Sequence, residues 1–375
     1  MNKKIIALMA AGIFLLSACS DPTGGSTTDT PADTTAKDSK TTATKHQLSE
    51  EYYKAVVTDG SYLTSKSRGA TLGLNSNFNL KAFEVGLMNL SQKHFSTDKY
   101  YFQEGQYIDS KTINNWLKRV SKDNPDGLNP EDNGKKEPDE RNPYYLNSVL
   151  EQDYMVKTDN NFKLGGISIG LAMNTIDYYQ KVEFGADFET KISHEELLKQ
   201  GKAMADKIVQ HLRETEGVGD VPITVGIFEQ SPKDSLAGGT FIAEAISENG
   251  NTKVGDWNTI KEKKVIFPLA EETSNELTNF ENFKAEVENF FPNLSGVTAE
   301  AYYTDDQLIK MKVNIITQFY GESEIISFTQ HVADKATTFL PPNIPIEITI
   351  GSINGTESFL ARKAGETSFY THVFN

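Results

Sequence analysis

Three consecutive segments decide the fold class: "GGISIGLAMNTIDYY" (165–179), "ISHEELLKQGKAMADKIVQHLRE" (192–214) and "VPITVGIFEQ" (221–230). The first and third are short, mostly apolar runs, and such runs are typical of buried strands. The middle segment places apolar or small residues at helical spacing, which predicts an amphipathic helix. These residues are Leu197, Gly201, Met204, Ile208 and Leu212. The strand-helix-strand order indicates an α+β fold.

The predicted helix has a clear start, because Ser193 and Glu196 have the spacing of a capping box. The same order of elements returns later in the chain. It consists of a strand in 307–320, a helix in 322–340 and a strand in 344–352. We also expect a helix before each unit, in "NPYYLNSVLEQDY" (142–154) and in "SNELTNFENFKAEVENFF" (274–291).

The repeated order predicts two related α+β units, in residues 143–250 and 251–375. Internal duplication is one interpretation. Coincidence is the other, because strand-helix-strand order is common in mixed folds. Residues 46–142 are expected to form an N-terminal helical and loop region, with helices in 79–95 and 110–120 and a surface loop rich in Pro, Gly, Asp and Lys from 121 to 143.

The N-terminus has the organisation of a secretory signal in residues 1–18. Lys3 and Lys4 form a short basic region, and the almost wholly apolar run 5–16 follows. A helix over this run and the next two residues would be about 21 Å long, which is too short for a hydrocarbon layer of roughly 30 Å. We therefore expect a cleaved signal rather than a membrane-spanning helix.

Cys19 is the one cysteine of the chain, so no internal disulfide can form. It follows Leu16, Ser17 and Ala18, and this ending resembles the lipobox of bacterial lipoproteins. The resemblance implies cleavage between Ala18 and Cys19 by signal-processing proteases and a diacylglycerol on the thiol. Two acyl chains give lasting attachment where one alone binds only marginally. The expected location is the extracellular face of the cell membrane.

Residues 20–45 are almost devoid of large apolar side chains. Such a segment cannot bury enough surface to offset its ordering entropy, so 19–45 is predicted to be a lipidated cysteine with a disordered tether. The chain after residue 45 is expected to be globular, since the whole sequence has 38% apolar residues, enough to build a core. A formal net charge of −15 repels phosphate backbones and argues against nucleic-acid binding.

Ser168 is the centre of a G-x-S-x-G pattern, from Gly166 to Gly170. Serine hydrolases need this serine on a sharp turn that runs into a helix. Here the pattern lies within a predicted strand, so we expect Ser168 to have a packing role. No nucleophile, base and orienting group can be assembled from the sequence, so the chain is not predicted to be an enzyme.

"NPEDNGKKEPDE" (129–140) partly imitates a calcium loop, with ligand-type residues at positions 1, 3, 5 and 12. The first position is Asn129 rather than aspartate, and no clear helices flank the segment. A solvated charged loop is therefore the favoured interpretation, with calcium binding left open. The histidines show no close ligand pair, so the sequence supports neither a metal nor a cofactor. They are His46, His94, His194, His211, His331 and His372.

Several long segments together resemble the CamS family of lipoproteins, precursors of the cAM373-type sex pheromones of Gram-positive bacteria. They are "LMNLSQKHFSTDKYYFQEGQYIDSKTINNWL" (87–117), "LEQDY" (150–154), "GISIGLAMNTIDYYQK" (166–181) and "LLKQGKAMADKIVQHLRE" (197–214), in addition to the lipobox and tether. In that family the mature lipoprotein has no settled activity. The last seven residues of the signal peptide can be released and provoke plasmid transfer in responding enterococci.

The resemblance places this heptapeptide on Gly12, Ile13, Phe14, Leu15, Leu16, Ser17 and Ala18. Its release would need a second cut between Ala11 and Gly12, and its partner would be a peptide receptor. The best-known pheromone of the family starts with Ala, has Ile where Leu15 stands and ends Ala-Ser. Because each buried methylene is worth about 0.8 kcal/mol, such differences in a small ligand change its affinity.

For the mature domain, two further functions stay open beside an interaction role. One is a solute-binding lipoprotein whose two units close around a ligand, and the other is an envelope enzyme acting in a cleft between them. The ligand of the mature domain and its oligomeric state are not determined by the sequence.

Overall fold

The computed structural model describes residues 40–70, 73–159, 161–270, 273–291 and 296–374. The predicted signal, the heptapeptide and Cys19 lie outside the described residues. Within them, no helix combines the length and the apolar character needed to cross a membrane.

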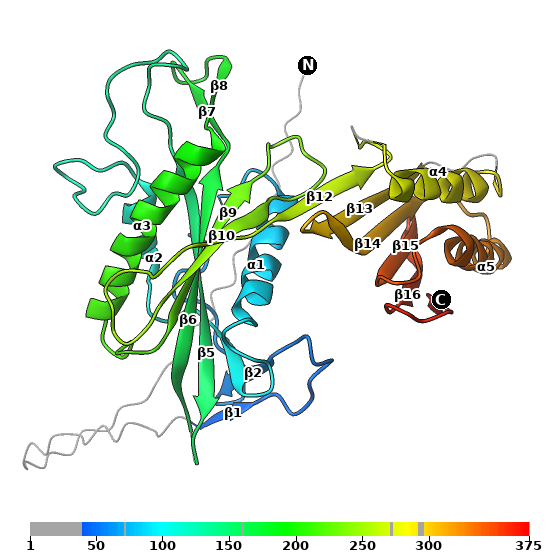
Figure 1. Ribbon diagram of the computed structural model, residues 1–375, viewed down its shortest axis with the longest axis horizontal. Helices are drawn as coiled ribbons and strands as arrows, with labels where there is room; N and C mark the ends of the chain where they lie inside the picture. Colours follow the sequence, from blue (N-terminus) through cyan, green and yellow to red (C-terminus); the bar gives the residue numbers. More distant parts are fainter. Residues whose placement is uncertain (1–39, 71–72, 160, 271–272, 292–295, 375) are drawn as a thin grey trace, which may run out of the picture. The chain divides into compact units, whose positions relative to one another are not determined.

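The first sheet has nine strands in the described residues, in the order β1-β2-β4-β5-β6-β9-β10-β11, with β3 paired to β2 (Figure 1). Their bounds are β1 Thr41–Ala43, β2 Lys54–Thr58, β3 Ser61–Tyr62, β4 Tyr100–Glu104, β5 Leu146–Lys157, β6 Phe162–Asn174, β9 Ile223–Gln230, β10 Thr240–Ser247 and β11 Asn258–Thr259. β6 and β9 run parallel, and the other pairs from β4 to β10 are antiparallel. The parallel pair is joined by helix α3 (His194–Glu214), after a separate hairpin of β7 (Ile176–Gln180) and β8 (Asp187–Lys191).

Helices cover both faces of the first sheet (Figure 1). On one face, α2 (Ser110–Leu117) and α3 share a core with Ile167, Ile169 and Leu171 of β6. On the other face, α1 (Asn77–Ser91) packs Phe83 and Leu87 against β6, β9 and β10. Burial on both faces explains why the middle of β6 and of β9 carries mostly apolar or small residues rather than a regular alternation of apolar and charged ones.

The second sheet has the order β12-β13-β14-β15-β16-β17. Its strands are β12 Glu262–Phe267, β13 Gly296–Thr304, β14 Gln307–Ile316, β15 Ile346–Ser352, β16 Gly355–Arg362 and β17 Tyr370–Val373. Helices α4 (Asn275–Glu288) and α5 (Glu322–Phe339) contribute to its core with Phe280, Phe283 and Phe328. β14 and β15 are the parallel pair, and α5 connects them.

The two sheets share one topology. The order β4-α2-β5-β6-α3-β9-β10 in the first corresponds to β12-α4-β13-β14-α5-β15-β16 in the second. In both, the four successive strand pairs are antiparallel, antiparallel, parallel and antiparallel. The α+β prediction is therefore confirmed, and the corresponding elements lie in separate sheets. β11, although it falls within the predicted second unit 251–375, pairs with β10 of the first sheet. A common origin of the units stays a hypothesis that this correspondence supports.

The predicted helices over 79–95, 110–120, 192–214, 274–291 and 322–340 are confirmed as α1 to α5. Ser193 caps α3, since its Oγ accepts a hydrogen bond from the Glu196 amide at 3.3 Å. The Glu196 carboxylate bonds to Lys199 and Gln200 instead of returning to the cap, so only half of the capping box forms.

The helix predicted for 142–154 is wrong, because this segment forms β5. Leu146, Val149, Leu150 and Tyr154 have helical spacing. A strand that is buried on both faces is apolar at consecutive positions, so its pattern can imitate a helix.

Two other segments also depart from the prediction. Thr41–Ala43, inside the predicted tether, pairs with β2 as β1, since threonine suits a strand and the neighbouring strand satisfies its backbone. β2, β3 and β4 lie in the region 46–142, for which only helices and loops were expected. The first sheet therefore includes strands that precede residue 143, where the first unit was predicted to begin.

Candidate ligand-binding site

A polar network closes the carboxyl ends of the parallel strands β6 and β9. Asn174 ends β6 and Gln230 ends β9, and the Gln230 side-chain amide donates to Asn174 Oδ1 at 2.8 Å. Gln230 Oε1 accepts from the Asn75 amide at 2.8 Å, and its carbonyl accepts from the Thr175 hydroxyl at 2.9 Å. Gln230 is fully buried, and these hydrogen bonds fix the position of its side chain. The network lies at the carboxyl edge of the parallel strands, where open α/β sheets bind ligands.

A cavity of about 520 Å³ opens beside this polar network, and we call it the β6–β9 cavity. Its volume is within the range of small-molecule sites. Its lining comes from residues 175–176, 191–192, 229–232, 235, 237–240 and 262–264. The cavity therefore draws on both strand ends, on the end of β8, on the start of β10 and on β12 of the second sheet.

His194 and Glu229 form an acid-base pair at this edge. Nδ1 of His194, the first residue of α3, lies 2.8 Å from Oε2 of Glu229, which lines the cavity. A carboxylate only accepts hydrogen bonds, so Nδ1 carries the proton and Nε2 is the remaining ring nitrogen for other contacts. The His194 side chain is about half exposed, at 54%.

The cavity lining carries three lysines, Lys191, Lys263 and Lys264, and two glutamates, Glu229 and Glu262. Lys264 Nζ donates to the Gly239 carbonyl at 2.9 Å. Burial lowers the pKa of this lysine, against the opposing effect of the Glu300 and Glu262 carboxylates. Partial desolvation likewise raises the pKa of Glu262. Both shifts weaken the charge of a group that lines the cavity.

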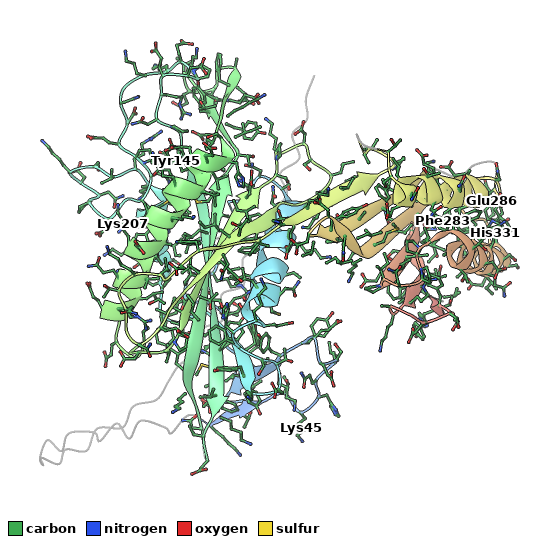
Figure 2. All side chains as sticks on the ribbon, viewed as in Figure 1. Lys45, Tyr145, Lys207, Phe283, Glu286 and His331 are labelled. Carbon is green, nitrogen blue, oxygen red and sulfur yellow. The ribbon has the colours of Figure 1, made fainter. Side chains whose placement is uncertain are left out.

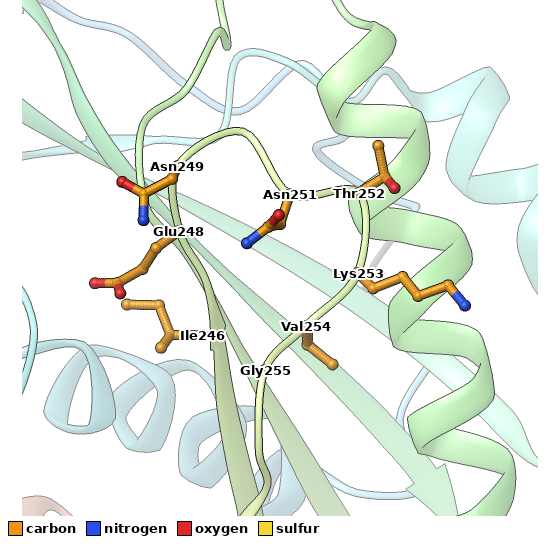
Figure 3. A pocket seen from close by; sticks show the side chains of 8 residues that line it. All are labelled: Ile246, Glu248, Asn249, Asn251, Thr252, Lys253, Val254 and Gly255. Carbon is orange, nitrogen blue, oxygen red and sulfur yellow. The ribbon is translucent and has the colours of Figure 1, made fainter.

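A second cavity of about 460 Å³ lies on the loop after β10. It is lined by 246, 248–249 and 251–255, all from one stretch of chain. Figure 3 shows the Glu248 and Lys253 side chains extending in opposite directions. Because its polar groups do not converge, this cavity is the weaker candidate.

Ser168 has the packing role expected for it. It is fully buried in the middle of β6, and its Oγ lies 2.7 Å from Oγ of Ser91 on α1. The turn that a nucleophile elbow requires is not present at this serine.

The loop 129–140 uses its first residue for structure. The Asn129 amide donates to the carbonyls of Leu117 and Leu146, and its Oδ1 accepts from the amides of Tyr145 and Leu146. Asn129 is thus fully committed inside the protein and is not available as the first ligand of a calcium loop.

The histidines of the described chain are dispersed among separate contacts. His211 lies edge-on to Trp116, and His331 Nε2 lies 3.0 Å from the Glu286 carbonyl on the neighbouring helix (Figure 2). In the described ranges, no group of three or more His, Cys, Asp and Glu side chains has the arrangement of a metal site.

Sequence reasoning did not identify His194, Glu229, Gln230, Lys191 or Lys264 as a group. The available signal was the polar run Glu229-Gln230-Ser231 directly after an apolar strand, since such residues lie at the carboxyl edge of a parallel pair. The contribution of β12 to the same cavity has no signal in the sequence.

The family model described as CamS sex pheromone cAM373 precursor matches residues 62–368. This chain belongs to the CamS family. The family resemblance that the sequence indicated is therefore confirmed. The family is one of pheromone precursors rather than a known class of enzyme.

Two solved structures agree with this assignment. A sex pheromone precursor from Lactobacillus salivarius is 43% identical, with a TM-score of 0.85, and the match covers 89% of this chain and 99% of that chain. The C-terminal domain of the staph-cAM373 precursor from Staphylococcus aureus is 30% identical, with a TM-score of 0.69, over 82% of this chain and 99% of that chain. No curated protein matches the chain.

Proposed function

We propose that this chain is the precursor of a lipoprotein anchored on the extracellular face of the cell membrane through a diacylglycerol on Cys19. The observation that carries this proposal is the sequence Leu16-Ser17-Ala18-Cys19 at the end of an apolar segment in a member of the CamS family. The polar segment that follows Cys19 suits a tether between the lipid and the folded domain.

Lipid attachment is tested by growing cells with radiolabelled palmitate and comparing the wild type with Cys19→Ser. The wild-type chain is expected to carry the label and to sediment with membranes. The variant is expected to lose the label and to remain uncleaved before residue 19. An unlabelled wild-type chain, or a variant that is labelled equally, would contradict the anchor.

The second part of the proposal is that the cleaved signal peptide yields the heptapeptide Gly12–Ala18 as a plasmid-transfer pheromone. The support is the position of these residues directly before the lipobox and the name of the family. Without charged side chains, the peptide suits an apolar receptor groove, where Phe14 would supply the largest buried surface.

Release is tested by mass spectrometry of culture supernatant for GIFLLSA, and activity by a transfer assay with the synthetic peptide. A reversed peptide of the same composition is the control. Detection of the peptide together with a response to nanomolar amounts of GIFLLSA alone would support the pheromone role. Absence of the peptide and of any response would remove it and leave the anchor standing.

The third part is that the mature domain binds a small ligand in the β6–β9 cavity. This role is favoured over catalysis because Glu229 of the lining orients His194 beside the cavity, while in the described part of the chain the pair's hydrogen bonds include no nucleophile. A thermal-shift screen tests it, because a ligand at 100 times its Kd adds about 2.7 kcal/mol of stability. Hydrolysis of a generic ester that His194→Gln abolishes would favour the enzyme alternative.

A further inference from the structure

The β6–β9 cavity combines an apolar lining with ammonium groups. Ile176, Ile192, Pro232 and Ala237 provide the apolar part. Lys191, Lys263 and Lys264 provide the cations in a chain whose formal net charge is −15. A ligand that matches both parts has an apolar body and an anionic group.

The acidic residues of the lining are less available to a ligand than the lysines. Glu229 is paired with His194 at 2.8 Å. The other carboxylate, Glu262, has its pKa raised by desolvation, which favours its neutral form. A cationic ligand would therefore meet one carboxylate that is already hydrogen-bonded to His194 and one whose anionic form is disfavoured by burial.

Two lysines of the cavity are free to meet an anion. Lys263 is paired with Asp306 at 3.0 Å. In the described part of the chain, the Lys191 ammonium makes no ion pair or hydrogen bond, and Lys264 donates to one carbonyl and makes no direct ion pair, although Glu300 and Glu262 act on it from further away. An anion beside Lys264 would offset the burial that disfavours its charge.

The hydrogen-bonding groups of the lining distinguish between apolar anions. Ser231, Ser235 and Thr240 place hydroxyls there, which donate to Asn79 Oδ1 and to the carbonyls of Ala237 and Glu262 and keep lone pairs that can accept a hydrogen bond. The N–H groups of a peptide can donate to these lone pairs, whereas the chain of a fatty acid has no hydrogen-bond donor to offer them.

We infer that the β6–β9 cavity binds the free C-terminal end of short apolar peptides, with the carboxylate between Lys191 and Lys264. This inference deepens the binding role proposed above and rests on it. The chain's own segment Gly12–Ala18 has the required chemistry, with no charged side chain and, once cut, a free carboxylate on Ala18. It is the natural probe.

The experiment measures binding of synthetic GIFLLSA to the mature chain carrying Cys19→Ser, by isothermal titration calorimetry. The free acid is compared with the C-terminal amide, which has the same apolar body without the charge. The free acid is expected to bind at least about tenfold more tightly, a difference of about 1.4 kcal/mol. Octanoate serves as the fatty-acid probe and is expected to bind more weakly than the peptide.

Substitutions of the two lysines test where the carboxylate of the peptide binds. Lys191→Gln is expected to reduce the preference for the free acid at least about fivefold, and Lys264→Met to do the same. Lys253→Gln, in the second cavity, is the matched control and is expected to leave both affinities unchanged. If Lys264→Met does not fold, Lys191→Gln decides alone, because Lys191 is exposed at the end of β8.

Equal binding of acid and amide would overturn the inference, and so would a preference that survives loss of the lysines. Tighter binding of octanoate, or no peptide binding at all, would overturn it as well. None of these results touches the anchor or the release of the heptapeptide, because the peptide is synthetic. A thermal-shift hit of another chemistry would keep the binding role while removing the peptide.

Discussion

Arg141 and Asp177 form a buried ion pair, with 2.6 Å between Nη1 and Oδ2. Their side chains are only 9% and 8% exposed. The guanidinium also lies 3.8 Å from the ring centre of Tyr179, and the carboxylate accepts a hydrogen bond from the Tyr144 amide at 2.8 Å. The pair therefore fastens the end of the long loop 121–143 to the β7–β8 hairpin, which leads towards the β6–β9 cavity.

Asp177→Ala is expected to destabilise the fold by about 3–5 kcal/mol, because it leaves Arg141 charged and unpaired in a buried place. Urea denaturation followed by circular dichroism measures the change. Glu140→Ala is the control, since the Lys135–Glu140 pair is exposed and 4.0 Å apart, and it is expected to cost less than about 1 kcal/mol. Equal costs for the two variants would contradict the assigned role.

Asp153→Asn is expected to flatten the pH dependence of stability. Burial, followed by the neighbouring Glu151 carboxylate, raises the pKa of Asp153 well above its ordinary value of 3.8. A pKa that is raised in the folded state favours folding in acid, and this contribution is lost as the pH rises through the folded pKa. The wild type should therefore lose stability relative to the variant as the pH rises from about 4.

Free energies of unfolding measured from pH 4 to 8 test this difference. Glu131→Gln, on the exposed loop, is the control and should follow the wild type. A variant that becomes less stable relative to the wild type as the pH rises would reverse the assigned sign.

Gly166→Ala is expected to destabilise the protein by about 1–3 kcal/mol through overpacking. A Cβ at this position would lie 2.2 Å from Cε1 of Phe95, whose buried ring is stacked on Tyr154 and cannot easily move. Gly296→Ala is the matched strand control, because a Cβ there would meet no atom of the described residues within 4 Å. Thermal melts of both variants measure the difference, and similar melting temperatures would show that the Phe95 ring yields.

Ser168→Ala is expected to cost about 1 kcal/mol of stability, the value of one buried hydrogen bond, and to leave any hydrolytic activity unchanged. Ser91→Ala should cost a similar amount. The double variant should cost less than the sum of the two, because both changes remove the same 2.7 Å contact. A loss of activity without a loss of stability would restore the hydrolase interpretation.

The helix α3 was predictable because its signal is local. Its apolar residues recur along one face, and Ser193 marks its start, so no knowledge of its neighbours is needed. β5 was not predictable for the opposite reason. Val149 joins the core under α3, while Tyr154 stacks with Phe95 on the other face, and a strand with two buried faces has no alternating pattern.

The candidate site divides in the same way. The proposed lipidation site, Cys19 with the residues before it, was predicted from adjacent positions in the sequence, without knowledge of the fold. The β6–β9 cavity needs the β7–β8 hairpin to bring Lys191 to the strand ends, and it needs Lys264 from beyond the first sheet. Neither lysine has a neighbour in sequence that marks it, so only the tertiary structure reveals their proximity.

Each sheet is built from an uninterrupted portion of the polypeptide: in the described residues, the strands of the first end at Thr259 and those of the second begin at Glu262. A chain that emerges progressively from its N-terminus could thus complete one hydrogen-bonded ladder before any strand of the other appears. Vectorial synthesis or translocation would then present two successive folding problems of moderate size. For each sheet, the time during which unpaired strand edges are exposed would be shorter than if both sheets had to fold together.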